Sequence, residues 1–435
     1  MKITTSKELK NAGWLIGGKV AQMLLSLVVG VLTARYLGPS DYGLIGYATS
    51  YTSFFMAFCT LGINSVIIKD FVDHPAEQGE ALGSSILLRV VSSFASALLI
   101  ISIVGMLDYG ETITIIVVAL CSISLVFHAL DTINYWFQSI YQSKVTAIAS
   151  FIAYCATAAY KIVLLVLEKD VKWFALSTSV DYLVLGMALL IAYKKYNGPK
   201  FKVSWQKAKN LLSSSYHYIL SGMMVAIYGQ TDKLMIKQML NETEVGYYTV
   251  ATTVCAMWTF VLQAIIDSIY PTIINQKDNE EQFNRKNRQL YAIVFYMSLF
   301  VSVLFVLLGD IAVNILYGEA YMPATLPLKI ITFYTAFSYL GVARNAWIVC
   351  RNQQKYLKTL YLGAAVLNVF LNFIFIPIWG TSGAAAASLI TQIFTSLILP
   401  LFVKALRPNA ILMLEAITLK GILYAKEPNK TKYNK

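Results

Sequence analysis

Charged residues are scarce in this 435-residue sequence. Only 13% of its residues are Asp, Glu, Lys or Arg, about half of the roughly 25% that is typical of a soluble globular domain. Hydrophobic residues make up 57% of the chain, and its mean hydropathy is +0.61. This composition excludes an ordinary soluble protein and indicates a chain embedded in a membrane.

Histidine and cysteine are too few and too scattered to form a metal or redox centre. The chain has 3 histidines and 5 cysteines, and the cysteines fall singly within or at the ends of apolar stretches. No Cys/Cys or Cys/His spacing typical of a metal site occurs. We therefore expect no metal and no other cofactor, and we interpret the cysteines as small core residues.

Catalytic motifs and large loops are also missing. The sequence contains no GxSxG, HExxH or P-loop pattern. The longest gaps between apolar stretches, 194–215 and 273–289, leave no room for a soluble domain. A membrane glycosyltransferase or polymerase would be expected to expose a sizeable loop with catalytic groups, so the sequence predicts that the protein is not an enzyme.

Long apolar runs are abundant. Stretches of about 20 apolar residues recur along the chain, and each is long enough to cross a hydrocarbon core of about 30 Å as a helix. They cover residues 13–34, 43–67, 83–107, 112–136, 146–167, 173–193, 216–240, 245–272, 290–316, 326–349, 358–377 and 382–403. We expect an all-α, polytopic membrane protein with about twelve transmembrane helices.

Lysine and arginine lie mainly on one side of these predicted spans. If the N-terminus is cytoplasmic, the outer loops receive only the cations Arg35, Lys169 and Lys172. The inner side receives the cation clusters at 194–209, 277–288, 351–358 and 404–435. This positive-inside bias supports an even number of spans and two cytoplasmic termini. The net charge of +12 therefore indicates contact with an anionic membrane surface and not with nucleic acid.

Two sequence matches indicate an internal repeat. A shift of 203 residues lays "YLGPSDYGLIGYAT" (36–49) over "MLNETEVGYYTVAT" (239–252), so that Gly43 falls on Gly246. A shift of 211 lays "QSKV" (142–145) over "QQKY" (353–356). Six predicted helices separate the copies, which makes the repeat parallel.

This repeat predicts the domain organisation. We expect two six-helix bundles, residues 1–200 and 201–403, around a central cleft. A basic cytoplasmic tail, 404–435, follows them. Its amphipathic stretch "AILMLEAITLKGIL" is expected to lie on the inner leaflet or to be disordered.

Ionisable residues inside the predicted spans are candidates for function, because a charge in the bilayer core is costly. They are Lys19, Arg89, His128, Asp131, Lys161, Asp181, Asp232, Lys233, Lys237, Asp267, Lys329 and Arg344. Several of the cations lie near a span end, where snorkelling to the interface is an open alternative.

The fifth and sixth helices of both halves carry polar groups at matching positions. At the shift of 211, Lys161 falls on Asn372 and Asp181 on Gln392. We expect these faces to line one cavity. Asn368 and Asn372 share a helical face, where they either line the cleft or form hydrogen bonds between helices.

Three stretches carry a resemblance to a known family. They are "ARYLGPSDYGLIGYATSYTSFFMAFCTLGINSVIIKD" (34–70), "GQTDKLMIKQMLNETEVGYYTVATT" (229–253) and "LNVFLNFIFIPIWGTSGAAAASLITQ" (367–392). The sequence resembles the polysaccharide transporter family of Wzx-type O-antigen and capsule repeat-unit flippases, over about residues 5–405. That family belongs to the superfamily that includes the MATE exporters and the lipid II flippases.

The resemblance implies a function and a location. It implies a flippase that moves an undecaprenyl-pyrophosphate-linked oligosaccharide from the inner to the outer leaflet of the bacterial cytoplasmic membrane by alternating access. It also implies membrane lipid, and proteins of glycan assembly such as a polymerase or a chain-length regulator, as partners. A MATE-like exporter of cationic drugs remains an alternative, although such an exporter would want an acidic cleft. An enzyme acting on lipid-linked glycans is the less favoured alternative.

A cationic cleft suits a pyrophosphate headgroup, because fixed cations in a low dielectric neutralise it. The residues expected to meet the headgroup are Lys19, Arg89, Lys161, Lys233 and Arg344. Asp181, Asp232 and Asp267 are expected to compensate these cations or to bind a coupling proton or sodium ion. Asn368, Asn372 and Gln392 complete the expected polar lining. Arg35, at the outer mouth of the first helix, either snorkels or acts as an outer gate.

Overall fold

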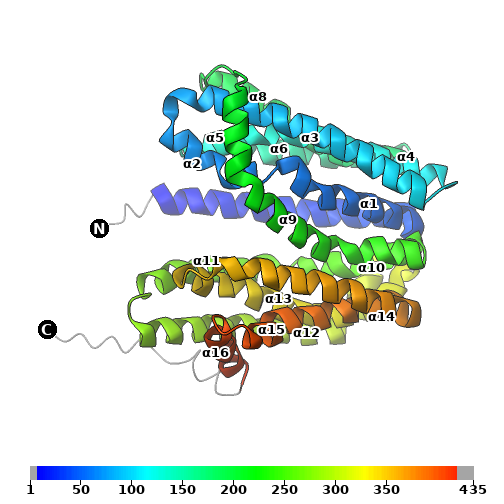
Figure 1. The fold of residues 1–435 in the computed structure, drawn as a ribbon. Coiled ribbons are helices and arrows are strands. Elements are labelled where there is room, and N and C mark those ends of the chain that lie inside the picture. Colours follow the sequence, from blue (N-terminus) through cyan, green and yellow to red (C-terminus); the bar gives the residue numbers. More distant parts are fainter. Residues whose placement is uncertain (1–6, 419–435) are drawn as a thin grey trace. The chain divides into compact units, whose positions relative to one another are not determined.

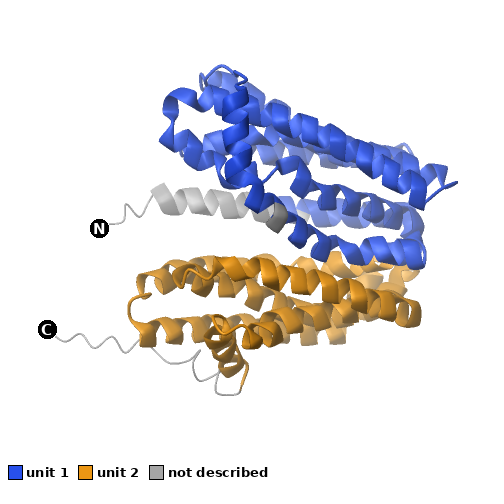
Figure 2. Cartoon of the chain, in the orientation of Figure 1, with its two compact units in different colours: residues 1–246 blue, residues 247–435 orange. Residues whose placement is uncertain are grey.

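The chain is described by a computed structural model that covers the backbone of residues 7–418, with side chains except those of residues 7–21, 24, 220 and 221. Within this range the secondary structure is entirely helical. The chain forms two compact units, 1–246 and 247–435 (Figure 2). Each unit is described by itself.

The first unit contains the helices from α1 to α9 and the beginning of α10 (Figure 1). Their bounds are α1 Lys7–Thr60, η1 Ile63–Ser65, α2 Ile67–Asp73, η2 Pro75–Glu77, α3 Gln78–Leu107, α4 Thr112–His128, η3 Ala129–Asp131, α5 Thr132–Ser139, α6 Ser143–Val166, α7 Val171–Ala175, α8 Ser177–Lys195, α9 Trp205–Met239 and α10 Glu242–Ala256. Helix α4 packs on α3 and α8, α8 packs on α6, and α9 packs on α1 and α3.

The second unit contains the remaining elements. Their bounds are α11 Thr259–Asn275, α12 Glu280–Tyr317, η4 Glu319–Ala324, α13 Thr325–Cys350, η5 Gln354–Tyr356, α14 Leu357–Ile393, the π-helical turn η6 Phe394–Ile398, α15 Leu399–Phe402 and α16 Arg407–Ile417. Helix α13 packs between α12 and α14, and its face joins a core around Leu290, Val294, Leu340 and Trp347.

Two long helices are interrupted by glycine where the sequence predicts the end of a span. Helix α1 runs through "LGPSD", but Gly38 there has φ 72° and ψ 175° and Pro39 follows it. Helix α14 is interrupted at Gly380, with φ 59° and ψ −139°. Glycine adopts positive φ without steric cost, and proline cannot continue the hydrogen-bond ladder. Each kink therefore divides one continuous element into two segments.

A helix-ending turn recurs at the predicted shift of 211 residues. Tyr141 and Asn352 both have positive φ, 58° and 53°. In the first copy the Gln142 N–H donates to Phe137 O over 2.8 Å, and in the second the Gln353 N–H donates to Ile348 O over 2.9 Å. This is the reversed hydrogen bonding of a Schellman-type C-cap. The two copies of this repeat therefore share their local backbone geometry as well as their sequence.

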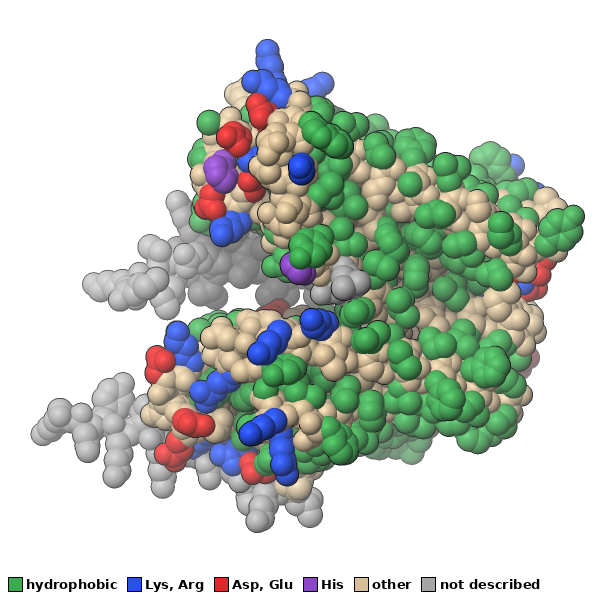
Figure 3. Space-filling model, in the orientation of Figure 1, with side chains coloured by type: hydrophobic (Ala, Val, Ile, Leu, Met, Phe, Trp, Pro, Cys, Tyr) green, Lys and Arg blue, Asp and Glu red, His purple; other side chains and the backbone are tan. Residues whose placement is uncertain are grey.

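The described helices have the length and surface of membrane-spanning segments. Within residues 7–418, eight segments are long and apolar enough to cross a membrane. Hydrophobic side chains are spread over the visible surface of each unit, and most of the visible charged side chains gather at the left of the view (Figure 3). The protein is thus a multi-pass helical membrane protein, while the count of twelve spans stays a prediction.

The unit boundary does not coincide with the predicted division near residue 200. Helix α9 packs against α1 and α3 and so lies in the first unit. Packing in one conformation does not define a repeat, so the division into bundles 1–200 and 201–403 and the cleft between them stay predictions.

The beginning of the expected tail is an ordered helix. Helix α16 buries Ala410, Leu412, Met413 and Ala416 and packs against α12. Arg288 pairs with Glu415 over 3.0 Å, and Asn409 donates to the buried Tyr291 hydroxyl. For residues 407–417 the expectation of disorder is therefore wrong. Residues 419–435 lie outside the described residues.

Candidate functional site

Arg89 is enclosed by protein in this conformation. Its side chain in α3 is 1% exposed, and its guanidinium donates to Thr132 Oγ1 (2.8 Å), His128 Nδ1 (2.7 Å) and His128 O (3.1 Å). Because Nδ1 accepts this bond, the His128 ring is neutral with its proton on Nε2. Arg89 thus braces α3 against the turn between α4 and α5.

Lys161 and Asp181 face each other across α6 and α8. The Thr157 hydroxyl, one helical turn before Lys161, donates to Asp181 Oδ1 over 3.2 Å. The Lys161 ammonium is close enough for its charge to interact with the Asp181 carboxylate. These two helices are therefore joined by polar groups at the predicted position.

The matching position in the second unit is also polar and hydrogen-bonded. Asn372 donates to Asn368 over 3.1 Å, and Asn368 donates to Ser388 over 3.3 Å across the two segments of α14. Thr157 and Asn368 are related by the shift of 211, so both units join this helix pair at an equivalent residue. Gln392 donates to Ser396 Oγ over 3.2 Å. The Asn368–Ser388 bond joins the two segments of α14, and Gln392 also donates to Phe337 O of α13 over 3.5 Å. The Asn372–Asn368 and Gln392–Ser396 bonds each join residues four apart.

Arg344 is a buried cation of the second unit. Its side chain in α13 is 4% exposed and donates to Thr395 O over 3.2 Å, while its Nε has no hydrogen-bond partner among the described residues. Among the described residues, the ionisable side chains near enough to influence it electrostatically are the phenols Tyr361 and Tyr291, and no carboxylate is among them. A buried guanidinium with only neutral partners is costly unless an anion joins it in some state of the protein.

The other predicted residues are dispersed. Asp232, in α9, is 8% exposed, and Lys233 beside it is half-buried. Asp267 is exposed on α11, where it accepts a bond from Gln263, and Arg35 is exposed on α1. The side chain of Lys19 lies outside the described residues.

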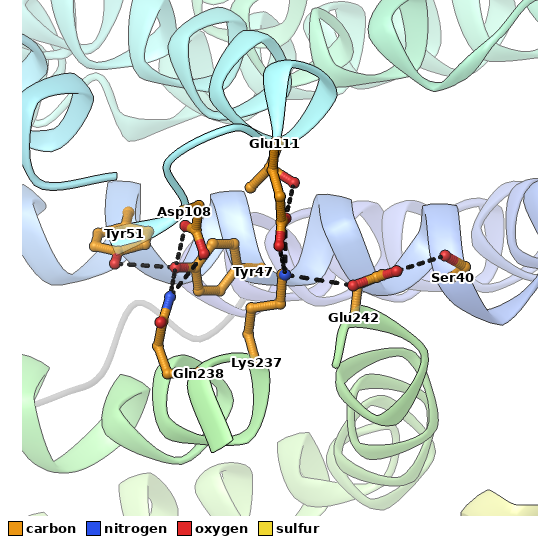
Figure 4. Close-up of polar contacts among 9 residues, drawn as sticks. Ser40, Tyr47, Tyr51, Asp108, Glu111, Lys237, Gln238 and Glu242 are labelled. Carbon is orange, nitrogen blue, oxygen red and sulfur yellow. Dashed lines mark hydrogen bonds and ion pairs between the residues drawn. The ribbon is translucent and has the colours of Figure 1, made fainter. Parts of the chain in front are cut away.

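A group of polar contacts lies where α9 ends, and we call it the Lys237 network (Figure 4). Its members are Ser40, Tyr47, Tyr51, Asp108, Glu111, Thr114, Lys237, Gln238 and Glu242. They come from α1, from the turn between α3 and α4, from the first turn of α4, from the last turn of α9 and from the start of α10.

Asp108 is the buried carboxylate of this network. It caps the C-terminal end of α3, where the helix dipole disfavours a negative charge. It is 5% exposed, and it accepts hydrogen bonds from the Tyr47 hydroxyl and from Gln238 Nε2, each 2.8 Å long. Gln238 also donates to Tyr47 over 2.7 Å. These neutral donors stabilise the carboxylate in place of water.

Lys237 is the buried cation of the network. It is 7% exposed, and its ammonium lies 2.9 and 3.0 Å from the two carboxylate oxygens of Glu111 and 3.4 Å from Glu242. Hydrogen bonding from Lys237 holds the pKa of Glu111 below its usual range, although partial burial of the carboxyl opposes this. Glu111 precedes α4 and Glu242 begins α10, so both carboxylates also lie at helix N-termini.

Two repeat-related glycines allow α1 and α10 to touch beside this network. A Cβ on Gly43 would lie 1.8 Å from Glu242 O, and a Cβ on Gly246 would lie 2.0 Å from Pro39 O. Any side chain at either position would collide with backbone. The two copies of the repeated turn therefore pack against each other reciprocally through their glycines.

Sequence reasoning missed this network as a site. It noted the acidic outer loops and counted Lys237 among the intramembrane cations, but it did not pair them. The usable signal was the match of Gly43 with Gly246, because small residues at equivalent helix positions often mark close helix contacts.

The fold is that of a known class of membrane transporters. The structure of the lipid II flippase MurJ in an inward closed conformation matches with a TM-score of 0.75, at 14% identity over 94% of this chain and 96% of that one. An inward-facing MATE multidrug transporter matches with a TM-score of 0.67, at 14% identity over 91% and 96% of the two chains. At 14% identity these matches show the fold alone, and it is the fold expected from the sequence.

Sequence comparison assigns the family. The profile of the polysaccharide biosynthesis protein family matches residues 9–277, more than half of the sequence, and the chain belongs to that family. The capsular polysaccharide biosynthesis protein CapF of Staphylococcus aureus is 20% identical over 89% of this chain and 97% of its own length. A protein of Shigella flexneri described as an O-antigen transporter is 20% identical over 90% and 96%. Of these two relatives, the Shigella flexneri protein is the one whose description names a transporter.

Proposed function

We propose that this protein is a flippase that moves an undecaprenyl-pyrophosphate-linked oligosaccharide repeat unit, of O-antigen or capsule type, between the leaflets of a bacterial cytoplasmic membrane. Arg344 carries the proposal: a buried guanidinium whose visible partners are neutral requires an anionic partner in some state of the protein. The membrane-transporter fold and the polysaccharide biosynthesis family support the same substrate class.

The cations of the helices supply the headgroup site in this proposal. Arg344 and Lys161 are its principal contacts, and Lys19, Lys233 and Arg89 are secondary ones. Arg89 would have to exchange its bonds to His128 and Thr132 for the pyrophosphate, which needs a rearrangement of α3. The polar lining would come from Asn368, Asn372 and Gln392. Arg35 would be an outer gate residue if it does not simply anchor α1 at the interface.

The direction of transport follows from the predicted orientation. With both termini in the cytoplasm, the Lys237 network lies at the outer face and the lysine-rich segment 194–209 at the inner face. The substrate then enters from the inner leaflet, where lipid-linked glycans are built, and leaves at the outer leaflet. A polymerase or chain-length regulator acting outside would receive the product.

Energy coupling would use the acidic residues. Asp181 beside Lys161 is the strongest candidate for binding a proton or a sodium ion, because protonation would alter the charge that Lys161 meets. Asp232 and Asp267 are the others. Transport into vesicles that responds to neither gradient would remove this part of the proposal.

The test is surface glycan in cells that carry single substitutions. Lys161→Ala and Arg344→Ala should each abolish surface glycan while the protein still accumulates in the membrane. Lys329→Ala is the matched control, because Lys329 already pairs with Asp310 over 2.7 Å. Surface glycan at the parental level in both Lys161→Ala and Arg344→Ala would refute the headgroup site.

A MATE-like exporter of cationic drugs predicts the opposite pattern. Removal of Lys161 or Arg344 would make its cleft more acidic and would not be expected to abolish export. Drug susceptibility of the same strains therefore distinguishes the two functions.

A further inference from the structure

Helix α9 is held at its two ends by different kinds of contact, all within the first unit. Its N-terminal end follows the linker 196–204, which is bound largely through backbone. Its C-terminal end carries Lys237 and Gln238, which are bound through side chains. This difference indicates which end can move.

The linker before α9 is seated on α3 with almost no space between the backbones. The Lys202 N–H donates to Gly79 O over 3.0 Å. A Cβ on Gly79 would lie 2.3 Å from Lys200 O, and a Cβ on Gly83 would lie 2.2 Å from Lys202 O. Two α3 glycines, one helical turn apart, thus form the surface on which the linker lies.

Side chains add to this attachment. Ser84 Oγ donates to Ser204 O over 3.1 Å and accepts from the Ser204 N–H over 2.9 Å, which fixes the residue that caps α9. Lys207, in the first turn of α9, is 8% exposed and pairs with Asp70 (2.9 Å) and Glu77 (2.7 Å).

The Lys207 ammonium stays charged at physiological pH. Burial lowers the pKa of the Lys207 ammonium, but hydrogen bonds to Glu77 and Asp70 outweigh burial and leave the pKa above its usual range. The N-terminal end of α9 is therefore held by paired charges as well as by backbone hydrogen bonds.

The contacts at the other end are of a kind that can separate without unfolding. Lys237 meets Glu111 and Glu242, and Gln238 meets Asp108 and Tyr47, in each case through side-chain atoms. Glu111 is about half exposed, so water can replace Lys237 as its partner. The glycine contact between α1 and α10 is a van der Waals contact, which likewise opens without loss of a helix.

We propose that α9 is a lever with a fixed pivot at Ser204–Lys207 and a releasable latch at Lys237–Gln238. Opening of the Lys237 network swings the C-terminal end of α9, together with residues 242–246 at the start of α10, away from α1 and the turn 108–111. The pivot keeps its contacts to α3 throughout. The link between this motion and glycan movement rests on the proposed flippase function, whereas the lever itself does not.

Cysteine cross-links at the two ends test the lever. The pairs are Ser84→Cys with Ser204→Cys at the pivot, and Glu111→Cys with Lys237→Cys at the latch, in a background whose five native cysteines are replaced. Transport of lipid-linked glycan into vesicles is measured before and after treatment with a short bifunctional thiol reagent, and again after reduction. The four single-cysteine variants are the controls.

The lever predicts that the latch cross-link, and not the pivot cross-link, inhibits transport. The latch cross-link should lower transport at least about tenfold, with recovery on reduction, and the pivot cross-link should leave transport within about twofold. If the pivot cross-link stops transport, whatever the latch cross-link does, the proposal of a fixed pivot is wrong. Unchanged transport with the latch cross-linked would overturn the latch.

A second measurement needs neither substrate nor transport. Spin labels at Tyr109 and Asn241 report the latch, and labels at Ala76 and Gln206 report the pivot, since all four residues are exposed. Distances are measured in lipid nanodiscs by pulsed electron paramagnetic resonance. In Lys237→Gln, the fraction of molecules with a longer latch distance should increase about two- to fivefold. The pivot distance should stay unchanged.

The spin-label result separates the lever from the function. A latch distance that Lys237→Gln does not change, or a pivot distance that changes as much as the latch distance, overturns the lever. If the distances behave as expected but the uncross-linked protein moves no lipid-linked glycan, the lever stands and the proposed function fails.

Discussion

The ammonium of Lys237 lies 2.9 and 3.0 Å from the two carboxylate oxygens of Glu111, and 126 residues separate them in the chain. This pair joins the last turn of α9 to the turn between α3 and α4. Lys237 is buried and Glu111 is about half exposed. The pair is thus stable enough to hold the helix end and accessible enough to be exchanged for water.

Neutralising Glu111 should weaken this end of the first unit. We expect Glu111→Gln to lower the free energy of unfolding by about 1 kcal/mol, because exposure of the carboxylate discounts the ion pair and Glu242 remains near Lys237. Thermal unfolding in nanodiscs measures the change. Glu168→Gln, an exposed carboxylate after α6, is the matched control and should change nothing. Equal effects of the two substitutions would deny the ion pair a stabilising role.

Glycine at position 246 should be required for the contact between α1 and α10. In Gly246→Ala the new methyl group would overlap the Pro39 carbonyl oxygen, and relief of such overpacking typically costs about 1–3 kcal/mol. Gly43→Ala should behave alike.

The control for this substitution is Gly229→Ala in α9, where a Cβ would meet nothing within 4 Å. Alanine favours a helix over glycine by up to about 1 kcal/mol, so Gly229→Ala should be neutral or stabilising. Thermal unfolding of the three variants checks the ranking, and a Gly246→Ala protein as stable as the parent would show that the two backbones are not in close contact.

The Glu111–Lys237 pair should resist mild acid. Because the folded state lowers the pKa of Glu111 from its ordinary value of 4.5, its stabilising contribution is complete above that value and is lost only as the pH falls through the lower folded pKa. The latch distance between labels at positions 109 and 241 should therefore stay constant from pH 8 to about pH 5 and lengthen below about pH 4. A change centred between pH 6 and 7 would point to a different titrating group.

Arg89 should matter for stability more than for substrate. In Arg89→Gln, His128 and Thr132 lose their donor in a buried site, and each buried acceptor left without a donor costs about 1–3 kcal/mol. We expect a large fall in the unfolding temperature and less protein in the membrane. Arg344→Gln is the comparison. If Arg89→Gln kept the parental stability and abolished transport, Arg89 would instead belong to the headgroup site.

Much of the fold was predictable because it depends on local chemistry. Gly38 and Pro39 marked the break in α1, and the long apolar runs marked the helices. The match of "QSKV" with "QQKY" pointed to a turn that the structure repeats down to its hydrogen bonds, after a tryptophan in each copy, Trp136 and Trp347.

The tertiary pairing of charges was not predictable. Lys237 and Glu111 belong to segments that meet only because α9 packs across α1 and α3, and nothing local to either residue selects its partner. Arg89 was expected to face a cleft, but a neutral histidine and a threonine on neighbouring elements enclose it. The presence of a charged residue within a membrane span does not show whether that residue joins helices or binds substrate.

Transport of the lipid-linked glycan by the purified protein is the most direct measurement of the central claim. Proteoliposomes are prepared with a labelled undecaprenyl-pyrophosphate-linked oligosaccharide in both leaflets, and an impermeant reagent modifies the glycan exposed outside. With the protein present, nearly all of the label should become modified, and with Arg344→Ala only about half, as in protein-free vesicles. Modification that stays at about half with the parental protein, whatever ion gradient is applied, would contradict the proposal that it is a flippase of such glycans.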